Sequence, residues 1–210
     1  MVTKLSEGRK TLAYYFTQSI VRLLSKTHIT PNTVTVLGFL ITIGATALVI
    51  TDNLIAAGFV ALLAGFFDML DGALARLTDQ TSKFGSVLDS TLDRLSEAIL
   101  LLGILVLFIF TDEDSALFIM LGKEWSVILV SIAILISPMV SYVRTKAEAI
   151  GLECQVGLFT RAERVILLAL GLLLSRINYA LTIAILILIV FSFFTVCQRL
   201  FYVWRHVKNN

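Results

Sequence analysis

The chain has 210 residues, of which 58% are hydrophobic and only 15% are charged, and its formal net charge is +2. Soluble domains are nearer to half apolar and a quarter charged, so this composition excludes a disordered chain, a collagen-like repeat and an ordinary soluble enzyme. The small net charge indicates no nucleic-acid partner. The two cysteines, Cys154 and Cys197, have no metal-binding or disulfide spacing. We therefore expect an all-α integral membrane protein.

The N-terminal segment differs from the rest of the chain. Between residues 8 and 26, apolar side chains recur at helical spacing among basic ones, which is typical of an amphipathic helix lying on a membrane surface. Thr30 and Pro31 then provide a cap and a first-turn proline for a new helix. Six apolar runs follow, most of them near the ~20 residues that a membrane-spanning helix needs. They cover residues 32–51, 54–77, 84–111, 124–149, 161–176 and 178–204. We predict one membrane domain over residues 1–210.

The basic residues predict how this domain is oriented. With six spans and a cytoplasmic N-terminus, nearly all Lys and Arg residues fall on the N-terminal side of the membrane. The opposite side holds only Lys123 and Arg176, together with the acidic loop 112–114. Cytoplasmic loops carry an excess of basic residues. We therefore expect a multi-pass protein of the cell (plasma) membrane with its N-terminus and its active site on the cytoplasmic side.

Four aspartates mark the segment that joins the second and third spans. Asp68 and Asp71 are three residues apart, and Asp89 and Asp93 are four apart, so each pair shares a helix face. Because the connection is short, the four carboxylates can converge. A charge at the bilayer centre costs about 2.5–3.5 kcal/mol unless water or a cation offsets it. All-oxygen ligands favour one or two Mg²⁺ or Mn²⁺ ions. The alternative is four solvated aspartates at helix ends.

The spacing of this segment carries a resemblance to a known family. It has the pattern D-x2-D-G-x2-A-R-x8-G-x3-D-x3-D, filled by Asp68, Asp71, Gly72, Ala75, Arg76, Gly85, Asp89 and Asp93. The pattern resembles the signature of the CDP-alcohol phosphotransferases, homodimeric membrane enzymes with a surface helix and six spans. In that family an alcohol displaces CMP from a CDP-linked lipid or alcohol.

The resemblance implies a role for each residue of the pattern. Asp68, Asp71 and Asp89 are expected to bind the metal, and Asp93 is expected to contact it and to act as the general base. Gly72, Ala75 and Gly85 are expected to let the nucleotide and pyrophosphate of the CDP-lipid approach the backbone. Arg76 is expected to pair with a phosphate or a carboxylate.

A second, basic cluster is a candidate for binding the acceptor alcohol. Guanidinium groups suit phosphate oxygens, although the orientation of the spans also accounts for basic residues here. The cluster contains Arg144, Lys146, Arg161, Arg164 and Arg199. Residues 141–153, 156–165 and 27–40 resemble a narrower branch, the phosphatidylinositol phosphate and archaetidylinositol phosphate synthases. That branch implies inositol 1-phosphate as acceptor and CDP-diacylglycerol or CDP-archaeol as donor.

Two other functions stay open at this point. A basic pocket does not distinguish inositol 1-phosphate from glycerol 3-phosphate, which would make the protein a phosphatidylglycerophosphate synthase. Carboxylates within membrane helices are also typical of cation transporters. Against transport, the acidic cluster lies at one membrane face, and no pair of broken helices occupies matching positions in two halves of the chain.

Overall fold

The computed structural model describes residues 21–23, 29–154 and 156–208, and these residues contain helices and no strand. The helices are α2 (Pro31–Ile50), α3 (Leu54–Leu77), α4 (Lys83–Phe110), α5 (Gly122–Ala149), α6 (Arg161–Leu173) and α7 (Ala180–Lys208), with a short 3-10 turn η1 (Ala116–Phe118). The all-α prediction is confirmed, and each predicted span corresponds to one of the six α-helices. The predicted surface helix over 8–26 lies outside the described residues except at 21–23, which are helical.

The helices divide into two groups by their capacity to cross a membrane. Within the described residues, α2, α3, α5 and α7 are long and apolar enough to do so. Helix α4 has 28 residues, but its first fifteen include Asp89, Asp93 and Glu97. Helix α6 has 13 residues, which cover about 20 Å, less than the ~30 Å hydrocarbon core. The chain is thus a multi-pass helical membrane protein, while the count of six crossings stays a prediction.

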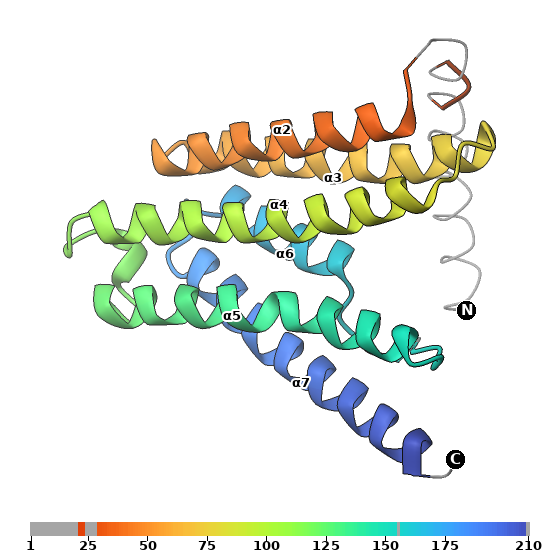
Figure 1. Cartoon of the computed structure of the whole chain (residues 1–210). Helices are drawn as coiled ribbons and strands as arrows, with labels where there is room; N and C mark the ends of the chain where they lie inside the picture. Colours follow the sequence, from red (N-terminus) through yellow and green to blue (C-terminus); the bar gives the residue numbers. More distant parts are fainter. Residues whose placement is uncertain (1–20, 24–28, 155, 209–210) are drawn as a thin grey trace, which may run out of the picture.

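Three helices begin at the same end of the molecule, and each has a side-chain cap. The Thr30 hydroxyl accepts a hydrogen bond from the Thr33 amide at the start of α2, and the Ser82 hydroxyl accepts one from the Gly85 amide at the start of α4. Thr160 and Glu163 form a capping box at the start of α6. In Figure 1 the starts of α2, α4 and α6 lie at the same end as the last turns of α3 and α5.

Close packing holds these helix ends in place. Helix α2 packs on α3 and α4, α3 packs on α6, and α5 packs on α4 and α7. A Cβ atom added at Gly58 of α3 would lie 2.9 Å from the carbonyl oxygen of Ala169 in α6. Small residues allow such close approach between membrane helices. Helix α3 is therefore fixed between α2 and α6, and its last three turns carry Asp68 and Asp71.

Candidate active site

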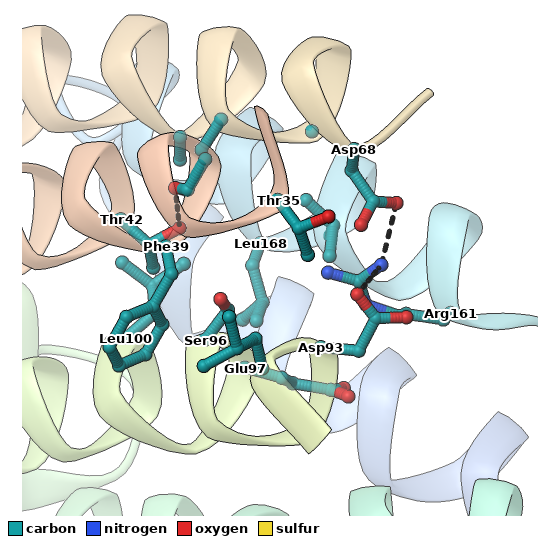
Figure 2. Close-up of a pocket in the computed structure, with 16 residues that line it drawn as sticks. Thr35, Phe39, Thr42, Asp68, Asp93, Ser96, Glu97, Leu100, Arg161 and Leu168 are labelled. Carbon is teal, nitrogen blue, oxygen red and sulfur yellow. Dashed lines mark hydrogen bonds and ion pairs between the residues drawn. The ribbon is translucent and has the colours of Figure 1, made fainter. Parts of the chain in front are cut away.

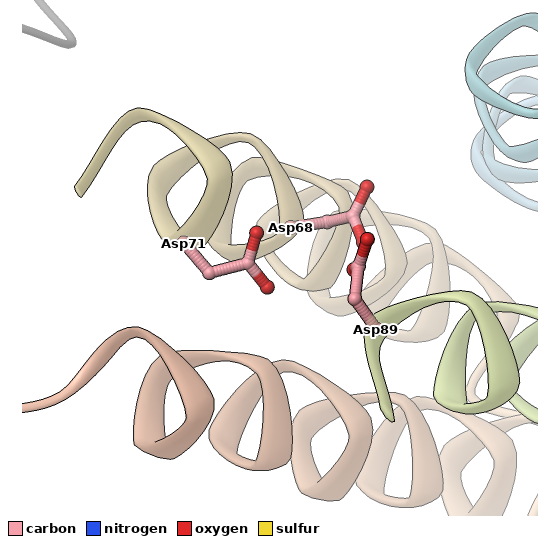
Figure 3. Close-up of side chains that lie close together, drawn as sticks. All are labelled: Asp68, Asp71 and Asp89. Atoms are coloured by element: carbon pink, nitrogen blue, oxygen red, sulfur yellow. The ribbon is translucent and has the colours of Figure 1, made fainter. Parts of the chain in front are cut away.

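Asp68, Asp71 and Asp89 meet where the end of α3 lies beside the start of α4. Each of them contributes one carboxylate oxygen to a group whose members lie within 4.8 Å of one another. Figure 3 shows the side chains of Asp68 and Asp71 leaving α3 toward Asp89 on α4. The structure thus brings together three of the four aspartates that the spacing groups.

The donor set and its environment fit a divalent cation. Two carboxylates about 4 Å apart repel by roughly 4 kcal/mol at an effective dielectric constant of 20. Asp71 is only 5% exposed, and its Oδ2 atom is buried without a hydrogen-bond partner. A buried, unpaired carboxylate oxygen is costly, and a cation would remove both costs. Because all three ligands are carboxylates, Mg²⁺ or Mn²⁺ matches the cluster best.

Asp93 lies one helical turn beyond Asp89 and outside this group of three. Its Oδ1 atom lies 2.6 Å from Nη1 of Arg161, and the same nitrogen lies 2.6 Å from Oδ2 of Asp68. Figure 2 shows the Arg161 guanidinium between the two carboxylates. Arg161 therefore links the proposed base to one of the expected metal ligands, a contact across helices that the sequence does not reveal.

A first pocket, here called the α2–α4 pocket, opens beside the aspartates and has a volume of about 250 Å³. Asp71 and Asp89 form part of its wall. All four residues expected to bind the CDP-lipid line it: Gly72, Ala75, Arg76 and Gly85. Asn32 and Thr35 of α2 line it as well, and neither was predicted from the sequence. The available signal was the helix start at Pro31, which lies at the same end of the molecule as the end of α3.

The two glycines of the α2–α4 pocket act differently. A Cβ atom added at Gly85 would lie 2.9 Å from Oδ1 of Asn32 and 2.9 Å from Oγ of Ser82, so a larger residue would displace the first turns of α2 and α4. At Gly72 an added Cβ would meet only the flexible end of Arg76, at 3.4 Å. The space beside Gly72 therefore belongs to the pocket and not to helix packing.

A second pocket, here called the α4–α7 pocket, has a volume of about 230 Å³. Its lining combines Asp93 with four of the five basic residues expected to bind the acceptor: Arg144, Arg161, Arg164 and Arg199. Lys146 does not line it, and its Nζ lies 5.7 Å from the centre of the Tyr142 ring. Residues of a helix turn by about 100° each. Lys146 therefore projects from a different face of α5 than Arg144.

The arginines of the α4–α7 pocket are held by other groups. Arg164, which is 1% exposed, uses Nε and Nη2 to contact the two carboxylate oxygens of Glu97 at 2.6 and 2.8 Å. Arg199 donates to the backbone carbonyls of Val156 and Val140. Arg144 pairs with Glu148 one turn along α5. These contacts fix the guanidinium groups at the pocket wall.

Several polar residues of the α4–α7 pocket were not predicted from the sequence, among them Arg94, Ser141 and Thr145. Arg94 donates from Nη2 to Oγ1 of Thr145 at 2.8 Å, which joins α4 to α5. Ser141 and Thr145 are four residues apart, on the same face of α5 as Arg144 and Glu148. Their helical spacing from Arg144 was therefore the feature of the sequence that could have predicted them.

Comparison with known proteins identifies the family. The sequence profile of the CDP-alcohol phosphatidyltransferases matches residues 28–204. The archaetidylinositol phosphate synthase of Methanothermobacter thermautotrophicus is 36% identical over 177 residues, which are 83% of this chain and 83% of that protein. The phosphatidylinositol phosphate synthase of Mycobacterium tuberculosis is 35% identical over 194 residues, 90% of this chain and 85% of that protein.

Solved structures of the mycobacterial enzyme have the same fold. The crystal structure with CDP-DAG bound superposes with a TM-score of 0.78 at 34% identity, covering 90% of this chain and 93% of that one. The complex with manganese and citrate gives a TM-score of 0.79 and covers 90% of this chain and 88% of that one. The resemblance noted in the aspartate motif thus extends over nearly the whole molecule. This chain belongs to the CDP-alcohol phosphatidyltransferase family.

Proposed function

We propose that this protein transfers a phosphatidyl or archaetidyl group from a CDP-linked lipid to a hydroxyl of inositol 1-phosphate and releases CMP. The observation that carries the proposal is the position of the aspartates. They lie between a pocket lined by the small residues of the family motif and a pocket lined by five arginines. The names of the relatives, which are inositol phosphate lipid synthases, support the acceptor. Family membership decides against the cation-transport alternative.

The CDP part of the donor is assigned to the α2–α4 pocket. Gly72 and Ala75 leave room for the pyrophosphate along α3, and Arg76 at the pocket wall can pair with a phosphate oxygen. Asp68, Asp71 and Asp89 would hold Mg²⁺ or Mn²⁺. When bound, the metal neutralises the charge of the pyrophosphate and stabilises the departing CMP. The manganese complex of the mycobacterial relative supports this assignment.

The acceptor is assigned to the α4–α7 pocket. Arg144, Arg161, Arg164 and Arg199 surround space for its phosphate group. Asp93 lines the same pocket, within reach of an acceptor hydroxyl held there. The hydroxyl oxygen attacks the phosphorus next to the lipid, and its proton passes to Asp93. The bond from that phosphorus to the bridging oxygen of CDP breaks, so the lipid keeps one phosphate and CMP leaves.

The placement in the membrane follows from the same assignment. We propose that the end of the molecule with the starts of α2, α4 and α6 faces the cytoplasm, because most basic residues gather there. The lipid donor then reaches the site from the bilayer and the soluble acceptor reaches it from the cytoplasm of a cell whose plasma membrane holds the protein. The family resemblance supports a homodimer.

The proposal is tested by CMP release from purified protein with CDP-diacylglycerol or CDP-archaeol and Mg²⁺ or Mn²⁺. Inositol 1-phosphate, glycerol 3-phosphate, free inositol and serine are compared as acceptors. We expect release with inositol 1-phosphate and little with free inositol, because the arginines require a phosphate. Release with glycerol 3-phosphate alone would keep the family reaction and replace the acceptor by that of a phosphatidylglycerophosphate synthase. Equal release with free inositol would contradict the arginine assignment.

A further inference from the structure

We propose that Glu97 is a positioning residue for the acceptor: together with Ser137, it orients Arg164 so that one guanidinium nitrogen is presented to the acceptor phosphate. The proposal deepens the function above and rests on its acceptor assignment. Glu97 does not line the α4–α7 pocket. It therefore acts through Arg164, without contacting the substrate.

A buried network carries this inference. Glu97 of α4 is 3% exposed and Ser137 of α5 is 0% exposed. The two carboxylate oxygens of Glu97 bind Nε and Nη2 of Arg164 on α6, and the Ser137 hydroxyl donates a third hydrogen bond to Glu97. The three residues come from three helices: Ser137 is 40 positions and Arg164 is 67 positions after Glu97 in the sequence. Two parallel hydrogen bonds to a carboxylate fix both the position and the plane of a guanidinium group.

The third guanidinium nitrogen of Arg164, Nη1, indicates where a ligand would bind. Its Nη1 atom is buried and has no hydrogen-bond partner. The same residue lines the α4–α7 pocket, where Arg144 and Arg199 are its neighbours. A buried charged donor without a partner is costly, and a phosphate oxygen in the pocket would provide that partner. Because Glu97 occupies the other two nitrogens, Nη1 is the part of Arg164 left for the acceptor.

Stability alone gives little reason for such a network. A buried ion pair seldom stabilises a protein more than well-packed apolar residues of the same size would. Glu97 also borders a cavity of about 30 Å³ that it shares with Asp93 and Arg161, as Figure 2 shows. Glu97 therefore lies at the wall of a cavity that the base and Arg161 also line. A substitution of Glu97 should therefore affect acceptor binding more than CDP-lipid binding.

The test measures the two KM values of Glu97→Gln in the purified full-length protein. Glutamine keeps the size and one oxygen but replaces the second acceptor for Arg164 by an amide that cannot accept. We expect the KM for inositol 1-phosphate to rise on the order of tenfold, with a change of at most about twofold in the KM for the CDP-lipid. Ser137→Ala should act in the same direction and less strongly. Equal rises in both KM values would contradict the proposal.

A second set of variants separates positioning from simple loss of structure. Glu97→Gln is repeated in an Arg164→Gln background, where a Gln–Gln pair leaves no buried charge. If Glu97 acts through Arg164, the second substitution adds no further rise in the acceptor KM. Independent, additive effects of the two substitutions would overturn the proposal.

Direct binding distinguishes a failure of this inference from a failure of the proposed function. Inorganic phosphate is titrated against wild-type protein and Glu97→Gln, and the shift in melting temperature is followed. A smaller phosphate-induced shift in Glu97→Gln supports the positioning role even if wild-type protein uses an acceptor other than inositol 1-phosphate. Equal shifts in the two proteins would contradict it, whichever acceptor is used.

Discussion

The two pockets that meet at α4 are built in different ways. The α2–α4 pocket is formed mainly by one stretch of the chain, the end of α3 and the start of α4, with small residues along its wall. The α4–α7 pocket collects long charged side chains from four helices that are far apart in sequence. In the first pocket, shape excludes large side chains at Gly85. In the second, partners such as Glu97 and the carbonyl of Val156 hold the guanidinium groups in place.

Because of this difference, the binding of each substrate should respond to a different kind of substitution. Donor binding should depend on steric fit, because the pyrophosphate must approach a helix backbone. Acceptor binding should depend on charge and on how the arginines are oriented. Substitutions in the two pockets should therefore change different kinetic constants, and residues at the boundary between the pockets should affect turnover itself.

The largest effect is expected for Asp93→Asn, which removes the expected base at the boundary between the two pockets. Asparagine cannot take the proton of the acceptor hydroxyl, so kcat should fall by about 10²–10⁴-fold, while CDP-lipid binding is largely kept. CMP release and equilibrium binding of the CDP-lipid measure the two quantities. Asp79→Asn, an exposed aspartate in the turn after α3, is the matched control and should stay active. Full turnover by Asp93→Asn would remove Asp93 as the base.

An intermediate effect is expected for Gly85→Ala on the donor side. The added methyl group would lie 2.9 Å from Asn32 and from Ser82, and must move the start of α2 or α4. Overpacking of this kind destabilises the native packing by about 1–3 kcal/mol. Because the displaced turns form the wall of the α2–α4 pocket, the KM for the CDP-lipid should rise by roughly tenfold or more. The acceptor KM should change much less. Gly44→Ala on α2, where an added Cβ meets nothing within 4 Å, controls for the loss of a helical glycine.

The smallest effect is expected from a pair of neighbouring cations on α5. Arg144→Gln removes a lining residue of the α4–α7 pocket that is half exposed and already paired with Glu148. Partly solvated charges contribute about 0.2–1 kcal/mol, so the acceptor KM should rise about two- to fivefold. Lys146→Gln should leave it unchanged. If Lys146→Gln had the larger effect, the lining of the pocket as described would be wrong.

The fold was predictable to a large extent because apolar runs and helix caps are local features. The run expected over 54–77 is α3 without a change of boundary, and the run expected over 161–176 is α6, which ends three residues earlier at Leu173. The packing partners of the helices were not predictable. The approach of α3 to α6 depends on Gly58 meeting Ala169, a contact more than one hundred residues apart that no local pattern encodes.

The candidate site divides in the same way. Asp68, Asp71 and Asp89 come together as their spacing predicts, since all three lie in one helix–turn–helix segment. The contacts of Arg161 with Asp93 and of Arg164 with Glu97 link α6 to α4 and appear only in the folded protein. Proximity in sequence groups Lys146 with Arg144, whereas helix geometry places them on different faces of α5.

Helix α4 has a further consequence for the reaction. Asp89 lines one pocket and Asp93 lines the other, and the two lie on the same helix face one turn apart, about 6 Å along the axis. The continuous backbone of α4 thus fixes the distance between the metal ligand near the leaving group and the residue that accepts the proton. That distance does not depend on the movement of a hinge or a lid. Inserting one residue between Asp89 and Asp93 would rotate the base by about 100° away from its pocket. Catalytic alignment is therefore built into the secondary structure before either substrate arrives.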